Sequence, residues 1–282
     1  MPVIGVDIGG TKIACARIST ELEIIASSTL PTLASEGYEA SLAQVFRAVD
    51  ACLTDDTAAI GICAPGPLNP KTGVILNPPN LPGWSNVPLA DIVRQRYGLR
   101  CAVENDANAA GLAEALFGAA RGCASVVYVT LSTGIGAGLI FNGKIHHGKN
   151  GAAAEGGHVS IDYRSKSICK CGTPGCIEAL ASGSALAARG LNPAALDAAQ
   201  LNELATMLGA WLGSLVSLID PDVIVVGGGL SQIGDPLFTR LRRIVPTRTI
   251  NQFAPETPIV PAKLAAHAGV FGAASVVLSQ FS

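Results

Sequence analysis

Three cysteines lie close together in a loop rich in glycine and proline, at Cys169, Cys171 and Cys176, and His158 precedes the first of them by eleven residues. Three thiolates and one imidazole form a tetrahedral set of zinc ligands. A closed set suits a structural metal, because it leaves no position for a substrate. Three buried thiols are the alternative, but this loop offers them little apolar core. The spacing therefore predicts a structural zinc site.

Two glutamates flank the cysteine cluster. Glu155 lies three residues before His158, and Glu178 lies two residues after Cys176. Isolated glutamates are usually solvated surface residues. A metal that fixes the loop would also hold both carboxylates at fixed positions, where they suit the hydroxyl groups of a sugar. The zinc loop is therefore expected to contribute to a carbohydrate site.

Three glycine-containing turns each follow an apolar segment, at Asp7–Lys12, Ser132–Gly134 and Gly227–Gly229. Glycine lets backbone N–H groups approach a phosphate, and the first turn adds a hydroxyl and a lysine. One such turn is equally well explained as a simple hairpin. Three of them favour a nucleotide-binding protein, in which Asp7 would hold Mg²⁺ through water.

An Asn-Asp pair, Asn105 and Asp106, lies between a strand-like segment and a helical stretch that begins near Ala107. A carboxylate at such a position is stabilised by the free N–H groups of the helix, so a capping role alone would explain the pair. Phosphoryl transfer to a sugar, however, needs one positioned carboxylate that accepts the hydroxyl proton. Asp106 is the predicted general base, with Asn105 binding a neighbouring hydroxyl.

Apolar patterning predicts the elements that position these residues. The expected strands span residues 2–9, 12–19, 22–30, 58–66, 100–105, 125–131, 135–141 and 222–230. The expected helices span residues 38–53, 107–118, 193–219 and 269–279, and residues 65–84 are expected as a loop. Strands that alternate with helices are typical of α/β folds. Because the strand-turn-strand arrangement of the N-terminus recurs at 125–141, we expect a duplicated fold of two lobes with nucleotide between them.

Composition excludes several classes of protein. The 282 residues suffice for two domains, and 19 basic against 21 acidic residues, without a dense basic cluster, argue against nucleic acid as a partner. The uncharged stretch from Cys123 to Asn142 has the length of a membrane span, but serine and glycine interrupt it as in two strands and a turn. The N-terminus has no basic region of a signal peptide, so no membrane and a cytoplasmic location are expected.

Seven motifs together resemble the ROK family of bacterial sugar kinases and related repressors, and they span nearly the whole chain. They are DIGGTK at 7–12, APGPL at 64–68, NPPNLPGW at 77–84, ENDANAA at 104–110, STGIGAG at 132–138, EGGH at 155–158 and CKCGTPGCIE at 169–178. The resemblance implies an α/β fold of the actin-like, ribonuclease-H-like ATPase type, with two lobes and a cleft. Residues 1–106 and 268–282 would form the small lobe, and residues 107–267 the larger lobe with the zinc loop.

The resemblance also implies a role for each matching residue. Asp106 would be the base, and the residues that bind sugar would be Gly66, Asn80, Asn105, Asp106, Glu155, His158 and Glu178. The residues that bind ATP and Mg²⁺ would be Asp7, Gly9, Gly10, Thr11, Lys12, Thr133, Gly134, Gly228 and Gly229. The zinc ligands would be His158, Cys169, Cys171 and Cys176. A homodimer is implied as well.

The implied activity is that of an ATP-dependent hexose kinase, or glucokinase, acting on the 6-hydroxyl of glucose. N-acetylmannosamine, N-acetylglucosamine and fructose are alternative substrates. A sugar-sensing repressor is disfavoured, because the first expected strand begins at Pro2 without a preceding helix-turn-helix and the basic residues are scattered. A zinc-binding module without enzymatic activity explains the cysteines but neither Asp106 nor the glycine turns.

Three residues depart from the family pattern. Ser132 replaces the first glycine of the usual Gly-Thr-Gly turn, and Ala154 and Gly156 stand in the usual Gly-Glu-Ile-Gly-His sequence. A Cβ at Ser132 restricts the backbone, so a slightly altered ATP geometry is expected. The other two changes are expected to alter the packing of the loop that contacts sugar, and with it the choice of sugar.

Overall fold

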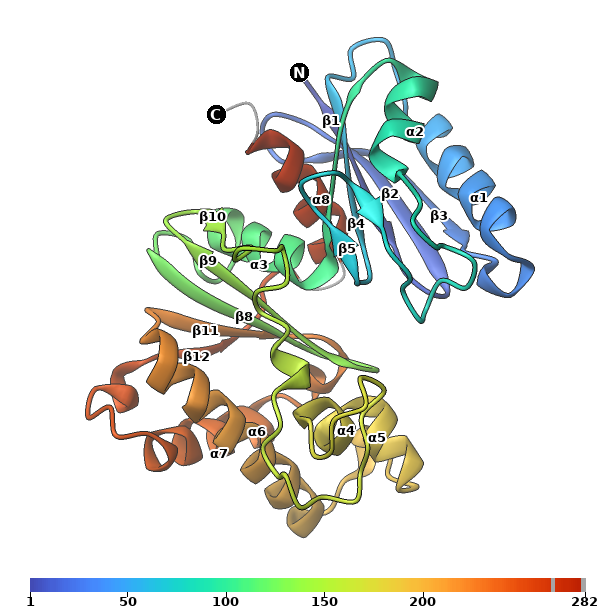
Figure 1. The fold of residues 1–282 in the computed structure, drawn as a ribbon. Coiled ribbons are helices and arrows are strands. Elements are labelled where there is room, and N and C mark those ends of the chain that lie inside the picture. Colours follow the sequence, from blue (N-terminus) through green and yellow to red (C-terminus); the bar gives the residue numbers. More distant parts are fainter. Residues whose placement is uncertain (265–266, 280–282) are drawn as a thin grey trace. The chain divides into compact units, whose positions relative to one another are not determined.

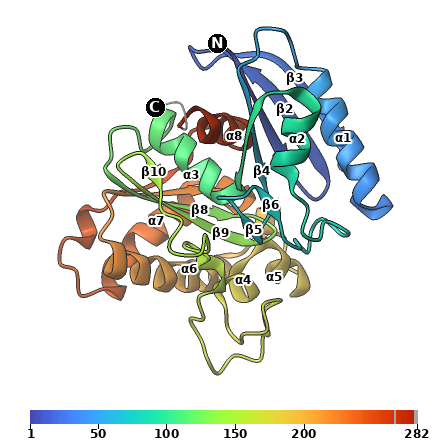
Figure 2. The ribbon, with the colours of Figure 1, turned by 45° about the horizontal axis from the view of Figure 1, so that its top comes forward.

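The computed structural model describes residues 1–264 and 267–279 (Figures 1 and 2). Residues 265–266 and 280–282, which the predicted domains include, lie outside the described residues. The described residues form two compact units. The first unit holds Met1–Ala113, His147–Ala152 and the C-terminal helix, and the second holds Glu114–His146 and the segment that begins at Ala153. The predicted domain boundary after Asp106 stays a prediction.

The first unit is built on a five-stranded sheet with the order β3-β2-β1-β4-β7. Its strands are β1 (Val3–Ile8), β2 (Lys12–Ile18), β3 (Ile24–Pro31), β4 (Ala59–Ala64) and β7 (Arg100–Asn105). The first three form an antiparallel meander, and β4 and β7 run parallel to β1. Valine and isoleucine are frequent in β1 and β4, because branched side chains pack well on a pleated surface. The predicted strands of this unit are confirmed.

One face of this sheet packs against α1 (Tyr38–Asp50) and α2 (Leu89–Tyr97) in a shared apolar core. The first helix was predicted, whereas α2 was not. The segment expected as a loop, residues 65–84, contains the short antiparallel strands β5 (Leu68–Asn69) and β6 (Val74–Ile75). A short 3-10 helix, Ala34–Glu36, precedes α1. The additional elements are short, and proline and asparagine obscure their periodicity in the sequence.

The C-terminal helix α8 (Ala268–Leu278) packs against the opposite face of the first sheet, beside β1 and β4 (Figure 1, dark red). Two strand residues, Gly5 and Gly61, make a close approach possible. A Cβ added to either would meet a backbone carbonyl of α8. The end of the chain therefore completes the core of the unit that the N-terminal residues begin.

The second unit repeats the same topology with the order β10-β9-β8-β11-β12. Its strands are β8 (Ser125–Leu131), β9 (Ile135–Phe141), β10 (Lys144–Ile145), β11 (Val223–Gly227) and β12 (Ile259–Pro261). Again the first three are antiparallel, and the last two run parallel to β8. The expected duplication is confirmed, and the uncharged stretch around 123–142 is the hairpin β8–β9.

Several helices pack on one face of the second sheet around a core that includes Val127, Leu204 and Leu241. They are α4 (Ile177–Ala181), α5 (Gly183–Ala188), α6 (Ala198–Ile219) and α7 (Asp235–Ile244). The 3-10 helices of this unit are Gly156–His158, Pro193–Ala195, Gly229–Ile233, Val245–Arg248 and Ala254–Glu256. Among the described residues only α6 is long and apolar enough to cross a membrane, but its apolar face packs in this core.

Candidate active site

The β1–β2 turn carries the first predicted nucleotide-binding residues. The backbone N–H of Gly9 donates to the carbonyl of Lys12 at 2.9 Å, which closes the hairpin. Gly10 lies against the loop after β6, where a Cβ would come within 3.1 Å of the Asn80 carbonyl oxygen. Thr11 and Lys12 are exposed. The fold thus brings Asn80, a predicted sugar residue, beside the first glycine turn.

Asp7 lies at the start of this turn, near the end of β1, and burial raises the pKa of its carboxyl group. The Cys63 thiol, at the end of β4, opposes this rise with a hydrogen bond to Asp7 Oδ1 at 3.5 Å. On the other side, Gly269 in the first turn of α8 leaves room for the carboxylate, since a Cβ there would collide with it. Three separate segments of the first unit therefore position Asp7.

Cys63 is a residue that sequence reasoning missed. A single cysteine in an apolar segment is usually a small core residue, and the side chain is fully buried. Its Sγ, however, lies 3.5 Å from Asp7 Oδ1 and 3.3 Å from the Gly269 carbonyl. Burial raises the pKa of this thiol well above its usual range, and the charges of Asp7 and Asp106 add to the effect. A neutral thiol therefore lies near the two carboxylates for which chemistry was predicted.

Asn105 and Asp106 occupy the junction between β7 and α3 (Asp106–Phe117). The Asn105 side chain caps the helix, since its Oδ1 accepts hydrogen bonds from the backbone N–H groups of Ala107 at 2.9 Å and Asn108 at 3.2 Å. Asp106 is the first helical residue and is exposed, and its Oδ1 accepts from Ala107 at 2.8 Å. A carboxylate at this end of the helix dipole is favourably placed. The expected position of Asp106 next to a cap is confirmed.

Glu104 and His147 form a pair that was not foreseen. Glu104 is 2% exposed, and its Oε1 accepts from the Asn105 backbone at 2.8 Å and from Asn108 Nδ2 at 3.0 Å. Its Oε2 lies 2.6 Å from Nε2 of His147. This hydrogen bond raises the pKa of His147, against the effects of burial and of Lys71. The partners are 43 residues apart, so no local sequence pattern could have shown the pair.

The β8–β9 turn, Ser132–Gly134, is closed by a hydrogen bond of 2.9 Å from the Ser132 N–H to the Gly134 carbonyl. Ser132 and Thr133 are exposed. Ser132 is absent from the described residues with positive φ, so its Cβ causes no backbone strain. The altered geometry that we expected at this departure from the family pattern therefore has no steric cause in the backbone.

The third glycine turn lies beside the second. Gly228 has a φ of 84°, and a Cβ there would collide with the carbonyl of Leu131 at the end of β8. Gly229 begins a 3-10 helix and faces open space, with no atom within 4 Å of a built Cβ. The two predicted nucleotide-binding turns of the second unit are therefore adjacent.

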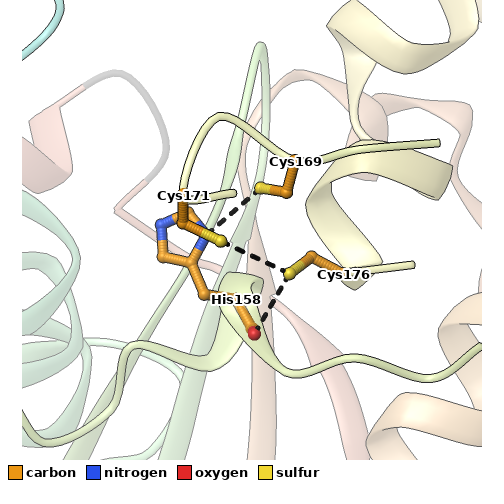
Figure 3. A group of neighbouring side chains, drawn as sticks. All are labelled: His158, Cys169, Cys171 and Cys176. Atoms are coloured by element: carbon orange, nitrogen blue, oxygen red, sulfur yellow. Dashed lines mark hydrogen bonds between the residues drawn. The ribbon is translucent and has the colours of Figure 1, made fainter. Parts of the chain in front are cut away.

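The predicted zinc ligands converge (Figure 3). The ligand atoms of His158, Cys169, Cys171 and Cys176 all lie within 4.8 Å of one another. Cys171 Sγ is 3.6 Å from Cys176 Sγ, and Cys169 Sγ is 3.4 Å from Nδ1 of His158. Zinc–sulfur bonds of about 2.3 Å in a tetrahedron separate two sulfurs by about 3.8 Å. The donor set and its spacing fit a zinc ion.

The orientation of His158 accommodates two predicted roles. Its Nδ1 faces Cys169, whereas Nε2 makes no hydrogen bond within the described residues. The ring is exposed. One nitrogen is therefore directed to the metal site, and the other is available to a ligand such as a sugar hydroxyl.

The loop before His158 carries the two remaining departures from the family pattern. Gly156 is buried, and a Cβ there would lie 3.0 Å from the Ala137 side chain and 3.1 Å from the indole of Trp211. The isoleucine usual at this position would not fit, because Trp211 of α6 fills its space. Ala154, where glycine is usual, has a φ of 67°, in the left-handed region. Glu155 between them is exposed.

Glu178, in the first turn of α4, is bound to the β8–β9 turn. Its Oε2 accepts the backbone N–H of Ile135 at 2.9 Å, and a Cβ on Gly134 would lie 2.5 Å from the same oxygen. A predicted sugar residue thus contacts a predicted nucleotide turn. Gly66, the remaining predicted residue, lies in the loop after β4 and is half-buried.

Comparison with known proteins identifies the family of the chain. The ROK family profile matches residues 3–280. The chain belongs to the ROK family. It is 35% identical to the glucokinase of Streptomyces coelicolor over 97% of this chain and 96% of that protein, and 32% identical to the glucokinase of Thermotoga maritima over 98% and 97%. It also resembles the crystal structure of a ROK family glucokinase from Streptomyces griseus in complex with glucose and AMPPNP, with a TM-score of 0.83, 33% identity and 100% of both chains covered.

These matches confirm two expectations from the sequence. The family was correctly identified from its motifs, and this ROK protein has the α/β, actin-like ATPase fold, in which two similar open sheets each carry a glycine turn.

Proposed function

We propose that this ROK protein is an ATP-dependent sugar kinase that transfers a phosphoryl group to the 6-hydroxyl of glucose. The similarity to glucokinases extends over practically the full length of the chain, at 32–35% identity. The observation that carries the chemical proposal is the β7–α3 junction, where an exposed Asp106 follows the Asn105 cap. N-acetylglucosamine, N-acetylmannosamine and fructose kinases are the alternatives.

Asp106 accepts the proton of the attacking hydroxyl in this mechanism. Phosphoryl transfer requires little covalent work from the protein, so one positioned carboxylate and stabilisation of the transferring group are sufficient. The cap formed by Asn105 fixes the backbone at Asp106, and Glu104 holds the Asn105 N–H from behind. These contacts support Asp106 as the general base and Asn105 as a ligand of an adjacent hydroxyl.

The remaining sugar contacts are assigned to residues that match the motifs of the family. In the second unit, Glu155 is exposed, His158 presents Nε2, and one oxygen of Glu178 makes no hydrogen bond within the described residues. Carboxylates accept hydrogen bonds from hydroxyl groups, and an imidazole that binds a metal through Nδ1 donates from its Nε2–H to a hydroxyl oxygen. In the first unit, Gly66 and Asn80 complete the proposed set.

ATP is assigned to the glycine turns. Backbone N–H groups of Gly10 and Gly134, with the hydroxyls of Thr11 and Thr133 and the Lys12 ammonium group, would contact phosphates. Gly9, whose own N–H closes the hairpin, would allow the phosphate to approach the turn closely. Asp7 would hold Mg²⁺ through water, and Gly228 and Gly229 would lie near the adenosine. Bound Mg²⁺ would neutralise charge on the phosphates.

Zinc is assigned to His158 and the three cysteines of the loop. With all four ligand positions taken by protein atoms, it would be a structural metal that holds the loop. We include in the proposal the homodimer and the cytoplasmic location that the sequence suggested. Sedimentation of the purified chain tests the dimer.

The proposal is tested by measuring ADP release from Mg-ATP by the full chain. Glucose, N-acetylmannosamine, N-acetylglucosamine, mannose and fructose form the panel, and a dehydrogenase specific for glucose 6-phosphate identifies the product. We expect glucose to be preferred. Preference for another sugar would reassign the substrate, and absence of turnover with every sugar would contradict the kinase.

Asp106→Asn should reduce turnover by about 10²–10⁴-fold with little change in glucose binding, since that is the usual contribution of a general base. The matched control is Asp235→Asn, because Asp235 is also an exposed first residue of a helix, α7. The control variant should have the same turnover rate as the original protein. Near-normal turnover of the Asp106 variant would remove that residue from the role of base.

A further inference from the structure

The β8–β9 turn is held from behind by the junction between α4 and α5, which no sequence motif had linked to it. The backbone N–H of Gly183 donates to the Ser132 carbonyl at 2.7 Å, and that of Ser184 donates to the Thr133 carbonyl at 3.1 Å. Two successive carbonyls of the turn are therefore held by backbone donors of this junction.

Residue 183 must be small for this contact to form. A Cβ built on Gly183 would lie 2.8 Å from the Ser132 carbonyl oxygen and 3.6 Å from Cα of Thr133. Both neighbouring atoms belong to the backbone, so they cannot move away as the end of a flexible side chain can. Ser182, 2% exposed, fixes the same junction by capping α5, with its Oγ accepting the Ala185 N–H at 3.1 Å.

The same junction carries Glu178. This residue lies in α4, which precedes α5 with only Ser182 between them. Its Oε2 binds the N–H of Ile135, on the far side of the turn from Ser132. One short segment, residues 178–184, therefore forms hydrogen bonds to both ends of the turn. The segment begins with a proposed sugar ligand.

We propose that segment 178–184 couples the sugar site to the nucleotide turn, with Gly183 as the positioning residue. This inference rests on the proposed function in assigning ATP phosphates to Ser132–Gly134. Glucose held by Glu178 stiffens the segment, and the segment fixes the turn, so glucose strengthens nucleotide binding. By reciprocity, the nucleotide strengthens glucose binding by the same factor.

The test compares Gly183→Ala with Ser184→Ala, because the latter removes an exposed hydroxyl and leaves the backbone donor in place. Calorimetry with Mg-AMPPNP, with and without glucose, gives the nucleotide affinity, and steady-state kinetics gives KM for ATP and for glucose. Gly183→Ala should weaken nucleotide binding by about tenfold, the equivalent of one or two lost hydrogen bonds. Its affinity for glucose in the absence of nucleotide, measured by calorimetry, should stay within about twofold of the original value. The increase in AMPPNP affinity that glucose produces should become smaller.

Ser182→Ala is the second variant, in case Gly183→Ala does not fold. Loss of the cap should weaken AMPPNP binding in the same direction but less, by about threefold. Equal AMPPNP affinity in the original protein and a folded Gly183→Ala variant would overturn the inference, as would an equal loss in Ser184→Ala. A protein that does not bind AMPPNP at all would overturn it too. If AMPPNP binds but no sugar is phosphorylated, the kinase proposal fails, and the AMPPNP comparison still decides the role of Gly183.

Discussion

The two glycine hairpins of this protein have the same position in two sheets of the same order, yet different kinds of element support them. The first, β1–β2, is supported by the sheet strands, the chain just after β3 and α8: Thr32 donates through Oγ1 to the Gly9 carbonyl at 2.6 Å, Cys63 of β4 contacts Asp7, and Gly269 of α8 leaves room for the Asp7 carboxylate. In the second, β8–β9, support comes from Glu178 and Gly183, outside the sheet.

This difference shows that the two copies of a duplicated scaffold carry different chemical groups at equivalent positions. The first hairpin places a half-buried carboxylate, Asp7, at its start, which suits the proposed cation site. The equivalent position of the second hairpin is Thr130, the partner of Gly136 in the β8–β9 register, and it has no charge. Its turn instead depends on a segment that follows directly after the zinc loop. We expect a disturbance of the zinc loop to change the conformational stability of the second turn and to leave that of the first turn unchanged.

Of the changes considered, loss of the metal site should produce the largest difference between the two turns. Cys171→Ser removes a proposed zinc ligand, so zinc affinity should fall by at least about tenfold, and glucose affinity should fall because Glu155, His158 and Glu178 all adjoin the loop. Hydrogen exchange should accelerate in the Ser132–Gly134 turn and stay unchanged in the β1–β2 turn. Metal analysis, calorimetry and exchange mass spectrometry measure the three effects.

Cys123→Ser is the control for that substitution, because Cys123 lies in the second unit but outside the cluster. It should retain zinc, glucose affinity and slow exchange in both turns. Unchanged metal content and glucose affinity in Cys171→Ser would contradict the role of the loop. Equal acceleration of exchange in both turns would contradict the difference in their support.

Much of this arrangement could be predicted from local sequence, because strand patterning, glycine turns and cysteine spacing are short-range signals. The zinc ligands show this best, since three of the four lie within eight residues. The supports of the turns could not be predicted. Glu178 meets Ile135 across 43 residues, and no sequence pattern indicates that the backbone of Gly183, the first residue of α5, contacts Ser132.

Departures from the family pattern were recognised in the sequence, but their consequences required the structure. The sequence predicted that Gly156 alters the packing of the loop, and only the fold shows that the indole of Trp211 occupies the space. Short elements such as α2 and β12 also escaped prediction. Nine residues of α2 and three of β12 give too little periodicity to distinguish them from loops.

The Glu104–His147 pair supports the β7–α3 junction of the first unit, and His147→Gln tests this support with a smaller expected effect. Glutamine can still donate a hydrogen bond to Glu104 but carries no charge. Since the pKa of His147 is raised in the folded protein, the added stability of the ion pair is fully present below about pH 6.5, the ordinary histidine value, and is lost as pH rises through the raised pKa. Urea unfolding should show the original protein more stable by about 1 kcal/mol at low pH, with the difference shrinking at high pH.

Lys71 is the other charged group that acts on His147, and it lowers the pKa. Lys71→Met should therefore extend the pH range over which the ion pair contributes. A difference between the original protein and His147→Gln that does not vary with pH would show that the imidazole acts only as a neutral donor.

Introducing glycine at two positions should have the smallest effects on the free energy of unfolding. The two variants distinguish a residue with backbone strain from one that departs from the family pattern without strain. Ala154→Gly should stabilise the protein by about 0.5 kcal/mol, because relief of the left-handed alanine slightly exceeds the added entropy of the unfolded chain. Ser132→Gly should instead destabilise by a similar amount, because no positive φ is relieved there and only the entropy cost remains. Urea unfolding of both variants measures the two signs. The same sign for both would mean that backbone conformation does not distinguish the two positions, and that the second turn tolerates serine for a reason other than its φ.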